Sequence, residues 1–144
     1  MTQTVNPDTG ARIKESFALQ SMMTSAGAEL VSVEEGRVVI SANVGEGFGQ
    51  QAGFIHGGLV FALGDSAAGY SALSVMPSGV EVMTVEMKIN FLAPASGRLR
   101  AEGRVIKRGR RLVVVASDVW SENEKGERKQ IAVLQGTMIP VETT

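Results

Sequence analysis

A single aspartate inside a long apolar segment is the residue of this sequence with the clearest potential for chemistry. Asp65 lies within Leu59 to Tyr70, which is apolar on nearly every side when drawn as a helix, and such a helix is typically buried. A buried carboxylate is costly unless it has partners. Asp65 belongs to a stripe of small residues that follow one another at helical spacings of three and four, namely Gly58, Ala62, Ala68 or Gly69, and Ala72. Two interpretations are open: Asp65 has a structural role on a narrow solvated face, or it lies in a groove that accepts a ligand or a second helix.

The tripeptide His56-Gly57-Gly58 begins this helix. The first backbone N–H groups of a helix have no internal partner and carry partial positive charge, and glycine allows a ligand atom to come close to them. A carbonyl oxygen placed there would be polarised as negative charge develops on it. The alternative is a tight entry turn with a purely structural His56.

The spacing between the two features predicts a dimer if both act on one substrate. Gly58 and Asp65 are seven residues apart, roughly 10 Å along a helix axis. One carbonyl group cannot contact both within one chain. The two groups would then come from two chains that pack antiparallel across a two-fold axis.

The elements expected around these residues are one long helix and six strands. A short helix is expected at 12–24, a strand hairpin at 28–34 and 37–44, the long helix at about 57–75, and four further strands at 82–92, 98–107, 111–121 and 129–141. In the strand at 82–92, Met83, Val85 and Met87 are expected on one face and Thr84 and Glu86 on the other. One long apolar helix with a strand-rich remainder predicts an α+β fold, in which a curved antiparallel sheet of about five to six strands wraps the central helix.

Three stretches of the sequence resemble the phenylacetate-degradation (PaaI-type) thioesterases of the hotdog superfamily. The resemblance runs from about Gly27 to Met138, and it is carried by Gly53-Phe54-Ile55-His56-Gly57-Gly58, by Leu63-Gly64-Asp65-Ser66-Ala67, and by the run from Thr84 to Ala95, which ends in Phe91-Leu92-Ala93-Pro94-Ala95. It implies a hotdog fold and hydrolysis of an acyl-coenzyme A (acyl-CoA) thioester at a site between two subunits.

The resemblance also implies roles for individual residues. Asp65 matches the catalytic carboxylate, which acts as general base on water or as nucleophile. Gly57, with Gly58 as a further candidate, matches the N–H donor to the thioester carbonyl from the facing subunit. His56 matches the residue that shapes that loop, and Thr84 matches a position often held by a hydroxyl that orients water or the carboxylate.

Two further binding positions are expected. Gln50 stands where related sequences commonly carry asparagine, and it supplies the same amide chemistry from a longer arm. Arg108 and Arg110 belong to a turn with four cations, 107–111. Arginine pairs well with phosphate oxygens, so this turn is either a contact to the phosphates of coenzyme A or a solvated turn without a ligand.

Composition excludes several classes of protein and site. The 144 residues (1–144) fit a single domain. The chain has no cysteine and one histidine, which excludes disulfides, a cysteine nucleophile and any multi-histidine metal site, and no cofactor is expected. The net charge of -1 does not favour nucleic acid or a membrane surface. The N-terminus lacks a secretory pattern, so a cytoplasmic location is expected.

The sequence therefore predicts a thioesterase for an aryl- or medium-chain acyl-CoA, assembled as a homodimer and as a dimer of dimers. Two alternatives remain: a hotdog hydratase or dehydratase that uses His56 and Asp65 for proton transfer at carbon, and a non-catalytic acyl-CoA binding module. The sequence does not separate a general-base route from one through a mixed anhydride.

Overall fold

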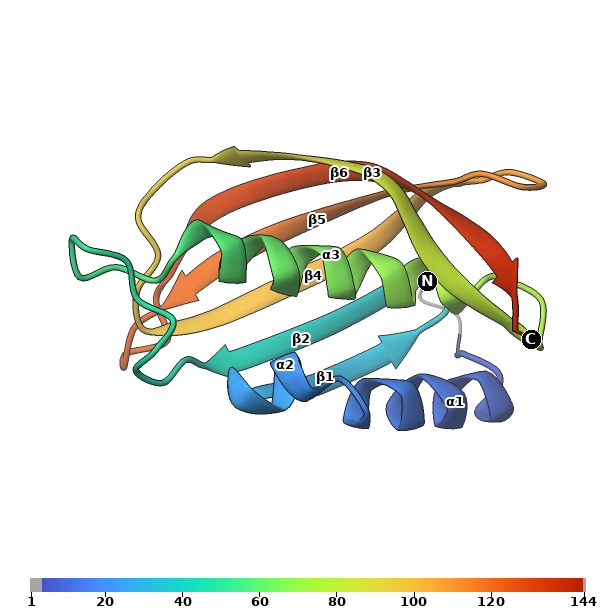
Figure 1. Ribbon diagram of the computed structural model, residues 1–144, viewed down its shortest axis with the longest axis horizontal. Helices are drawn as coiled ribbons and strands as arrows, with labels where there is room; N and C mark the ends of the chain where they lie inside the picture. Colours follow the sequence, from blue (N-terminus) through green and yellow to red (C-terminus); the bar gives the residue numbers. More distant parts are fainter. Residues whose placement is uncertain (1–3, 144) are drawn as a thin grey trace.

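The computed structural model describes residues 4–143, which form three helices and six strands (Figure 1). In chain order they are α1 (Pro7–Ala18), α2 (Ser21–Ser25), β1 (Ala28–Glu34), β2 (Arg37–Asn43), α3 (Gly57–Leu73), β3 (Val80–Phe91), β4 (Arg98–Arg108), β5 (Val113–Glu122) and β6 (Arg128–Glu142). Among the described residues, no helix is long and apolar enough to cross a membrane.

The strands form one antiparallel sheet that curves around α3 (Figure 1). The order is β1-β2-β4-β5-β6-β3, so β1 and β3 are the two edge strands. The buried face of α3, which includes Leu59, Leu63 and Ala67, packs into one apolar cluster with Ile40 and Leu134 of the sheet. This arrangement is the hotdog fold, and the prediction of an α+β fold with a wrapped central helix is confirmed.

Small residues let the helix lie very close to the sheet. A methyl group on Gly103 of β4 would collide with the backbone of Ala67, and one on Gly64 would come within 2.7 Å of Leu134. The hydroxyl of Ser117 donates to the carbonyl of Gly64 at 2.6 Å. These contacts fix the position of α3, and therefore of Asp65, relative to the strands.

The N-terminal helix expected at 12–24 is wrong in its extent, because the structure has two helices there. α1 starts earlier, since Asn6 caps it by accepting from the N–H of Asp8 and Pro7 fits the first helical position. It ends before Leu19, which is 81 % exposed and does not contribute to an apolar stripe. Gln20, between the helices, donates to the hydroxyl of Tyr70 at 2.7 Å and thereby ties this region to α3.

Strand β3 does not alternate as expected, because it contains a β-bulge between Thr84 and Glu86. The extra residue reverses the in–out order of the strand. Met87 packs against the core, whereas Met83 and Val85 are 56 % and 55 % exposed. The prediction that Met83, Val85 and Met87 share one face is therefore wrong, and the hydroxyl of Thr84 points toward α3.

Candidate active site

Asp65 and Thr84 are in direct contact. The hydroxyl of Thr84 donates to Oδ1 of Asp65 at 2.8 Å, and Sδ of the buried Met138 lies 3.1 Å from the same hydroxyl. Asp65 is half-buried. Burial raises its pKa, and the hydrogen bond from Thr84 lowers the pKa and offsets part of that effect. A carboxylate with a raised pKa is a stronger base for a water molecule, as general-base catalysis near neutral pH requires.

The start of α3 leaves one backbone donor free. The imidazole Nδ1 of His56 accepts from the N–H of Gly58 at 2.8 Å and so caps the helix. The carbonyl of His56 accepts from Leu59 at 3.0 Å. Within residues 4–143, the structure has no acceptor for the N–H of Gly57. Gly57 is therefore the available donor, whereas the N–H of Gly58 is already used.

Capping by His56 has a measurable consequence for stability. Replacing His56 with alanine leaves the N–H of Gly58 without its partner, and we expect a loss of about 1 kcal/mol in the free energy of unfolding. His56→Asn keeps a short side-chain acceptor at the cap position and should retain most of that stability. Urea denaturation of the three proteins measures the difference. Equal midpoints and slopes for wild type and His56→Ala would show that the cap is energetically unimportant.

A groove opens beside Gly57. It has a volume of about 420 Å³, and most of the side chains that line it are apolar, with Gln50 as an amide; the lining residues are Gln50, Phe54, Ile55, Gly57, Val60, Phe91, Leu92, Ala93, Pro94, Ala95 and Ile131. A methyl group at position 57 would lie 2.9 Å from Cζ of Phe91, so the ring of Phe91 covers the helix start. The free N–H and the groove thus belong to one region of the surface.

Gln50 orders the loop that leads to this helix. Its Oε1 accepts from the N–H of Ala52 at 2.5 Å and from that of Phe54 at 3.3 Å. The side chain lines the groove beside Gly57, as expected for a binding residue, but its amide oxygen is engaged with its own loop. Its amide nitrogen is the group left to meet a ligand.

Gly57 and Asp65 lie on one side of α3 but not next to each other. They are eight residues apart in the same helix, about 12 Å along its axis. Among the side chains of the first half of α3, Phe61, Ala62 and Asp65 retain access to solvent. A single chain therefore presents a donor and a base that cannot both contact one carbonyl group.

The expected phosphate contacts, Arg108 and Arg110, lie at the opposite end of α3 from Gly57. The hairpin between β4 and β5 projects beyond the C-terminal end of the helix (Figure 1). A methyl group on Gly36 would contact both Val105 of β4 and Val75, which follows α3, at 3.8 and 4.0 Å. Within residues 4–143 neither arginine has an ion-pair partner. Both guanidinium groups are thus available to an anion.

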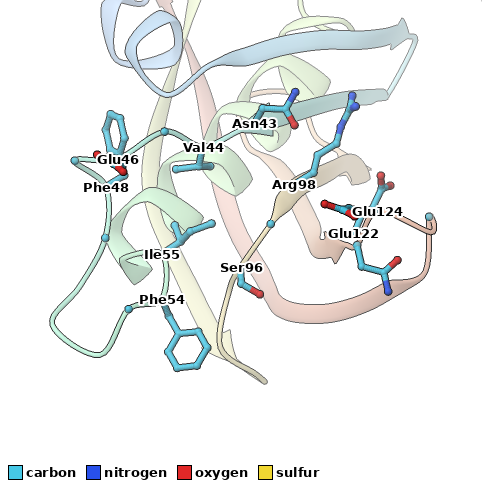
Figure 2. A pocket seen from close by; sticks show the side chains of 17 residues that line it. Asn43, Val44, Glu46, Phe48, Phe54, Ile55, Ser96, Arg98, Glu122 and Glu124 are labelled. Carbon is cyan, nitrogen blue, oxygen red and sulfur yellow. The ribbon is translucent and has the colours of Figure 1, made fainter.

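A larger groove, of about 1130 Å³, lies between the loop before α3 and the turn between β5 and β6. Figure 2 shows Phe48, Phe54 and Ile55 on the loop side and Arg98 and Glu122 across from them. Its lining includes no residue of α3 and neither Asp65 nor Thr84. No motif in the sequence marked this groove, because it is formed by loops that are distant along the chain.

Two of the charged groups of this larger groove, Arg98 and Glu122, already have partners. Arg98 donates to the hydroxyl of Ser41 at 3.0 Å, and Glu122 pairs with Arg128 at 2.8 Å. We therefore place the candidate active site at the smaller groove and α3, where an unpartnered donor and a carboxylate of raised pKa occur.

Comparison with known sequences identifies the family. The family model described as the thioesterase superfamily matches residues 52–127. The 1,4-dihydroxy-2-naphthoyl-CoA hydrolase of Listeria monocytogenes is 30 % identical over 105 residues, which are 72 % of this chain and 85 % of that protein. A protein of Saccharolobus solfataricus that is named as an esterase is 34 % identical over 88 residues, which are 60 % of this chain and 62 % of that protein.

Solved structures give the same result. A thioesterase family protein from Silicibacter pomeroyi superposes with a TM-score of 0.90 at 34 % identity, over 94 % of this chain and 99 % of that one. The E. coli PaaI protein from the phenylacetic acid degradation operon shares the fold, with a TM-score of 0.83 at 21 % identity, over 98 % and 99 % of the two chains. The resemblance read from the sequence is confirmed, and the chain belongs to the thioesterase superfamily.

Proposed function

We propose that the protein hydrolyses acyl-CoA thioesters at two equivalent sites, each shared between two subunits of a dimer. The observation that carries this proposal is the pair of complementary groups on α3. Gly57 offers a free N–H at the positive end of the helix, and Asp65 is a half-buried carboxylate of raised pKa held by Thr84. Such a donor and base are the two groups that acyl transfer to water needs.

The edge strand β3 supports dimer formation. Within the described chain, β3 pairs with β6 on one side only, and it is twelve residues long. Its exposed apolar side chains include Met83, Val85 and Phe91, which are 55–56 % exposed. A long edge strand with exposed apolar residues pairs readily with another chain. We assign the dimer interface to β3 and to the adjacent open face of α3.

Two-fold symmetry then completes the site. In a closed dimer the same surface of both chains meets. A two-fold axis perpendicular to α3 makes the two α3 helices run antiparallel. Antiparallel packing brings Asp65 of one chain to the level of Gly57 of the partner subunit. The separation of about 12 Å within one helix becomes the separation between two equivalent sites.

The reaction follows from these positions. The N–H of Gly57 binds the thioester carbonyl oxygen, and this contact strengthens as the oxygen becomes an oxyanion. Asp65 of the other chain accepts a proton from water, whose oxygen attacks the carbonyl carbon; collapse of the adduct breaks the C–S bond and releases thiolate. In the second route Asp65 itself attacks and water opens the mixed anhydride. Solvent oxygen found in Asp65 after a single turnover in labelled water would identify the anhydride route, with water attacking the Asp65 carbonyl carbon, because the general-base route places no solvent oxygen in Asp65.

The position of the basic hairpin supports coenzyme A as the leaving group. From Asp65 to the end of α3 is eight residues, about 12 Å, and Arg108 and Arg110 lie beyond that end. In the antiparallel dimer this end runs alongside the groove and Gln50 of the partner subunit. The thiol arm would occupy the groove, and its phosphates would meet the two arginines.

The most direct test of the proposed function is release of free thiol from a panel of acyl-CoA esters, followed with a chromogenic disulfide reagent. We expect hydrolysis of aryl or medium-chain esters; the Listeria relative is named as a hydrolase of an aromatic acyl-CoA. Tight binding of the ester without thiol release would identify a binding module instead. Loss of water from a 3-hydroxyacyl ester without thiol release would identify a dehydratase.

Thr84→Val tests how Asp65 is tuned. Valine has nearly the shape of threonine but cannot donate to Asp65, so the effect that lowers the pKa is lost while burial still raises it. We expect the acid limb of kcat/KM, where Asp65 becomes protonated and inactive, to move to higher pH. Thr137→Val is the matched control, because Thr137 donates to Glu86 elsewhere on β3. If the acid limb of Thr84→Val stays at the wild-type pH, Thr84 does not tune the pKa of the catalytic base.

A further inference from the structure

We infer that Phe61 sets the acyl specificity of this site by closing it at the two-fold axis, so that each site accepts a compact acyl group, either an aryl group or one of the shorter medium chains. This inference rests on the proposed function and on the dimer that it requires. It names a residue and a substrate class that the catalytic groups alone do not define.

Phe61 lies at the midpoint between the two catalytic positions. It is four residues from Gly57 and four from Asp65, so it is about 6 Å from each along the helix axis and on the same stripe. If Asp65 of each chain meets Gly57 of the other, the two-fold axis must cross α3 at the level of residue 61. The two Phe61 side chains then meet at the axis, between the two sites.

Access to solvent around Phe61 agrees with this position. Phe61 is half-buried in the single chain, with one side packed against the apolar core and the other open. Its neighbours on the open face, Gly58 and Ala62, are small and are not buried. If two antiparallel helices meet at these residues, a space remains beside Gly58 and Ala62. The aromatic ring of Phe61 closes one end of that space.

The acyl group must enter this space because coenzyme A takes the other direction. The nucleotide end of the substrate is large and charged, so it remains in solvent. In the proposed dimer it would extend from the groove beside Gly57 toward Arg108 and Arg110 of the partner subunit. The acyl chain extends from the carbonyl carbon in the opposite direction, toward the two-fold axis. The space available to it before it meets Phe61 is about 6 Å deep. That depth suits an aryl ring, which the face or edge of Phe61 can contact favourably.

The test is the kcat/KM profile of the wild type and of Phe61 variants across phenylacetyl-, butyryl-, hexanoyl-, octanoyl- and decanoyl-CoA. We expect the wild type to favour the compact esters. Phe61→Ala removes the barrier, and we expect it to raise the ratio of decanoyl to phenylacetyl activity at least tenfold. Phe61→Trp should lower that ratio. Size-exclusion chromatography identifies variants that no longer dimerise, and Phe61→Leu replaces the alanine variant if it dissociates.

Phe54→Ala is the matched control, because Phe54 lines the outer groove and is 39 % exposed. We expect it to change all esters by a similar factor, since they share the coenzyme arm. A wild-type protein that releases no thiol from any ester would contradict the proposed function itself. A wild-type protein that hydrolyses esters, with a profile shifted by Phe54→Ala and not by the Phe61 variants, would overturn the role of Phe61 alone.

Discussion

Asp65→Asn is expected to lower kcat for thioester hydrolysis by about 10²- to 10⁴-fold, the range that a positioned general base contributes. Asparagine keeps the size of the side chain and still accepts from Thr84, whose hydroxyl donates to Oδ1 in the wild type. It does not accept a proton from water and does not form the anhydride, so both routes fail. Steady-state thiol release measures the effect.

The fold should survive this change, and its stability at neutral pH should be equal to or higher than that of the wild type. Because burial raises the pKa of Asp65, the native state holds that proton more tightly than the unfolded state, and the carboxyl group costs stability as pH rises through the interval between the two pKa values. The neutral amide of Asp65→Asn removes this cost, so Tm at pH 7 should be equal or higher.

Asp118→Asn is the matched control for Asp65→Asn. Asp118 pairs with Arg104 at 2.8 Å and accepts from Gln130 at 2.8 Å on β5, away from the candidate site. Its replacement should leave kcat near the wild-type value. Normal turnover by Asp65→Asn would show that Asp65 is structural and that hydrolysis uses another group.

Gly57→Pro is expected to reduce kcat by about 10²- to 10³-fold, the effect of removing one donor to an oxyanion. Proline deletes the one N–H at the helix start for which the described chain has no acceptor. Position 57 is the first residue of α3, where proline is favoured. His56 already has φ -60° and ψ 135°, the conformation that a residue before proline adopts. The helix should therefore form as in the wild type.

Gly57→Ala distinguishes the effect of losing the N–H donor from the effect of crowding the ring of Phe91. Alanine retains the N–H but introduces the same Cβ, which would lie 2.9 Å from Cζ of Phe91. We expect Gly57→Ala to keep most of its kcat and to change KM, because the ring of Phe91 must shift. Equal loss of kcat in the two variants, with circular dichroism unchanged, would show that space at position 57 matters and the N–H does not.

The sequence predicted the elements that have local signals. The hairpin of β1 and β2 and the long helix α3 were found because glycine turns and an apolar run mark them. The bulge in β3 was missed, since the alternation of Met83, Val85 and Met87 is equally consistent with a regular strand. The break between α1 and α2 was also missed, because it depends on the contact of Gln20 with Tyr70, fifty residues away.

The sequence predicted which residues form the candidate site better than it predicted the role of each residue. Resemblance to thioesterases pointed to Asp65 and Thr84, and the structure joins them, but only the bulge explains how Thr84 reaches the helix. Resemblance named Gly57 as the N–H donor and left Gly58 as a further candidate. The orientation of the His56 ring decides that Gly58 is capped and Gly57 is free.

Mixing two inactive variants tests the sharing of sites between subunits most directly. Asp65→Asn and Gly57→Pro subunits are exchanged by co-expression with different affinity tags, so that heterodimers can be counted. Each heterodimer has one site with both groups intact, contributed by opposite chains, and one site with neither. Half of randomly paired dimers are heterodimers, so the mixture should recover about a quarter of wild-type activity. Heterodimers that are demonstrably present yet no more active than their parents would contradict a site built from Gly57 of one chain and Asp65 of the other.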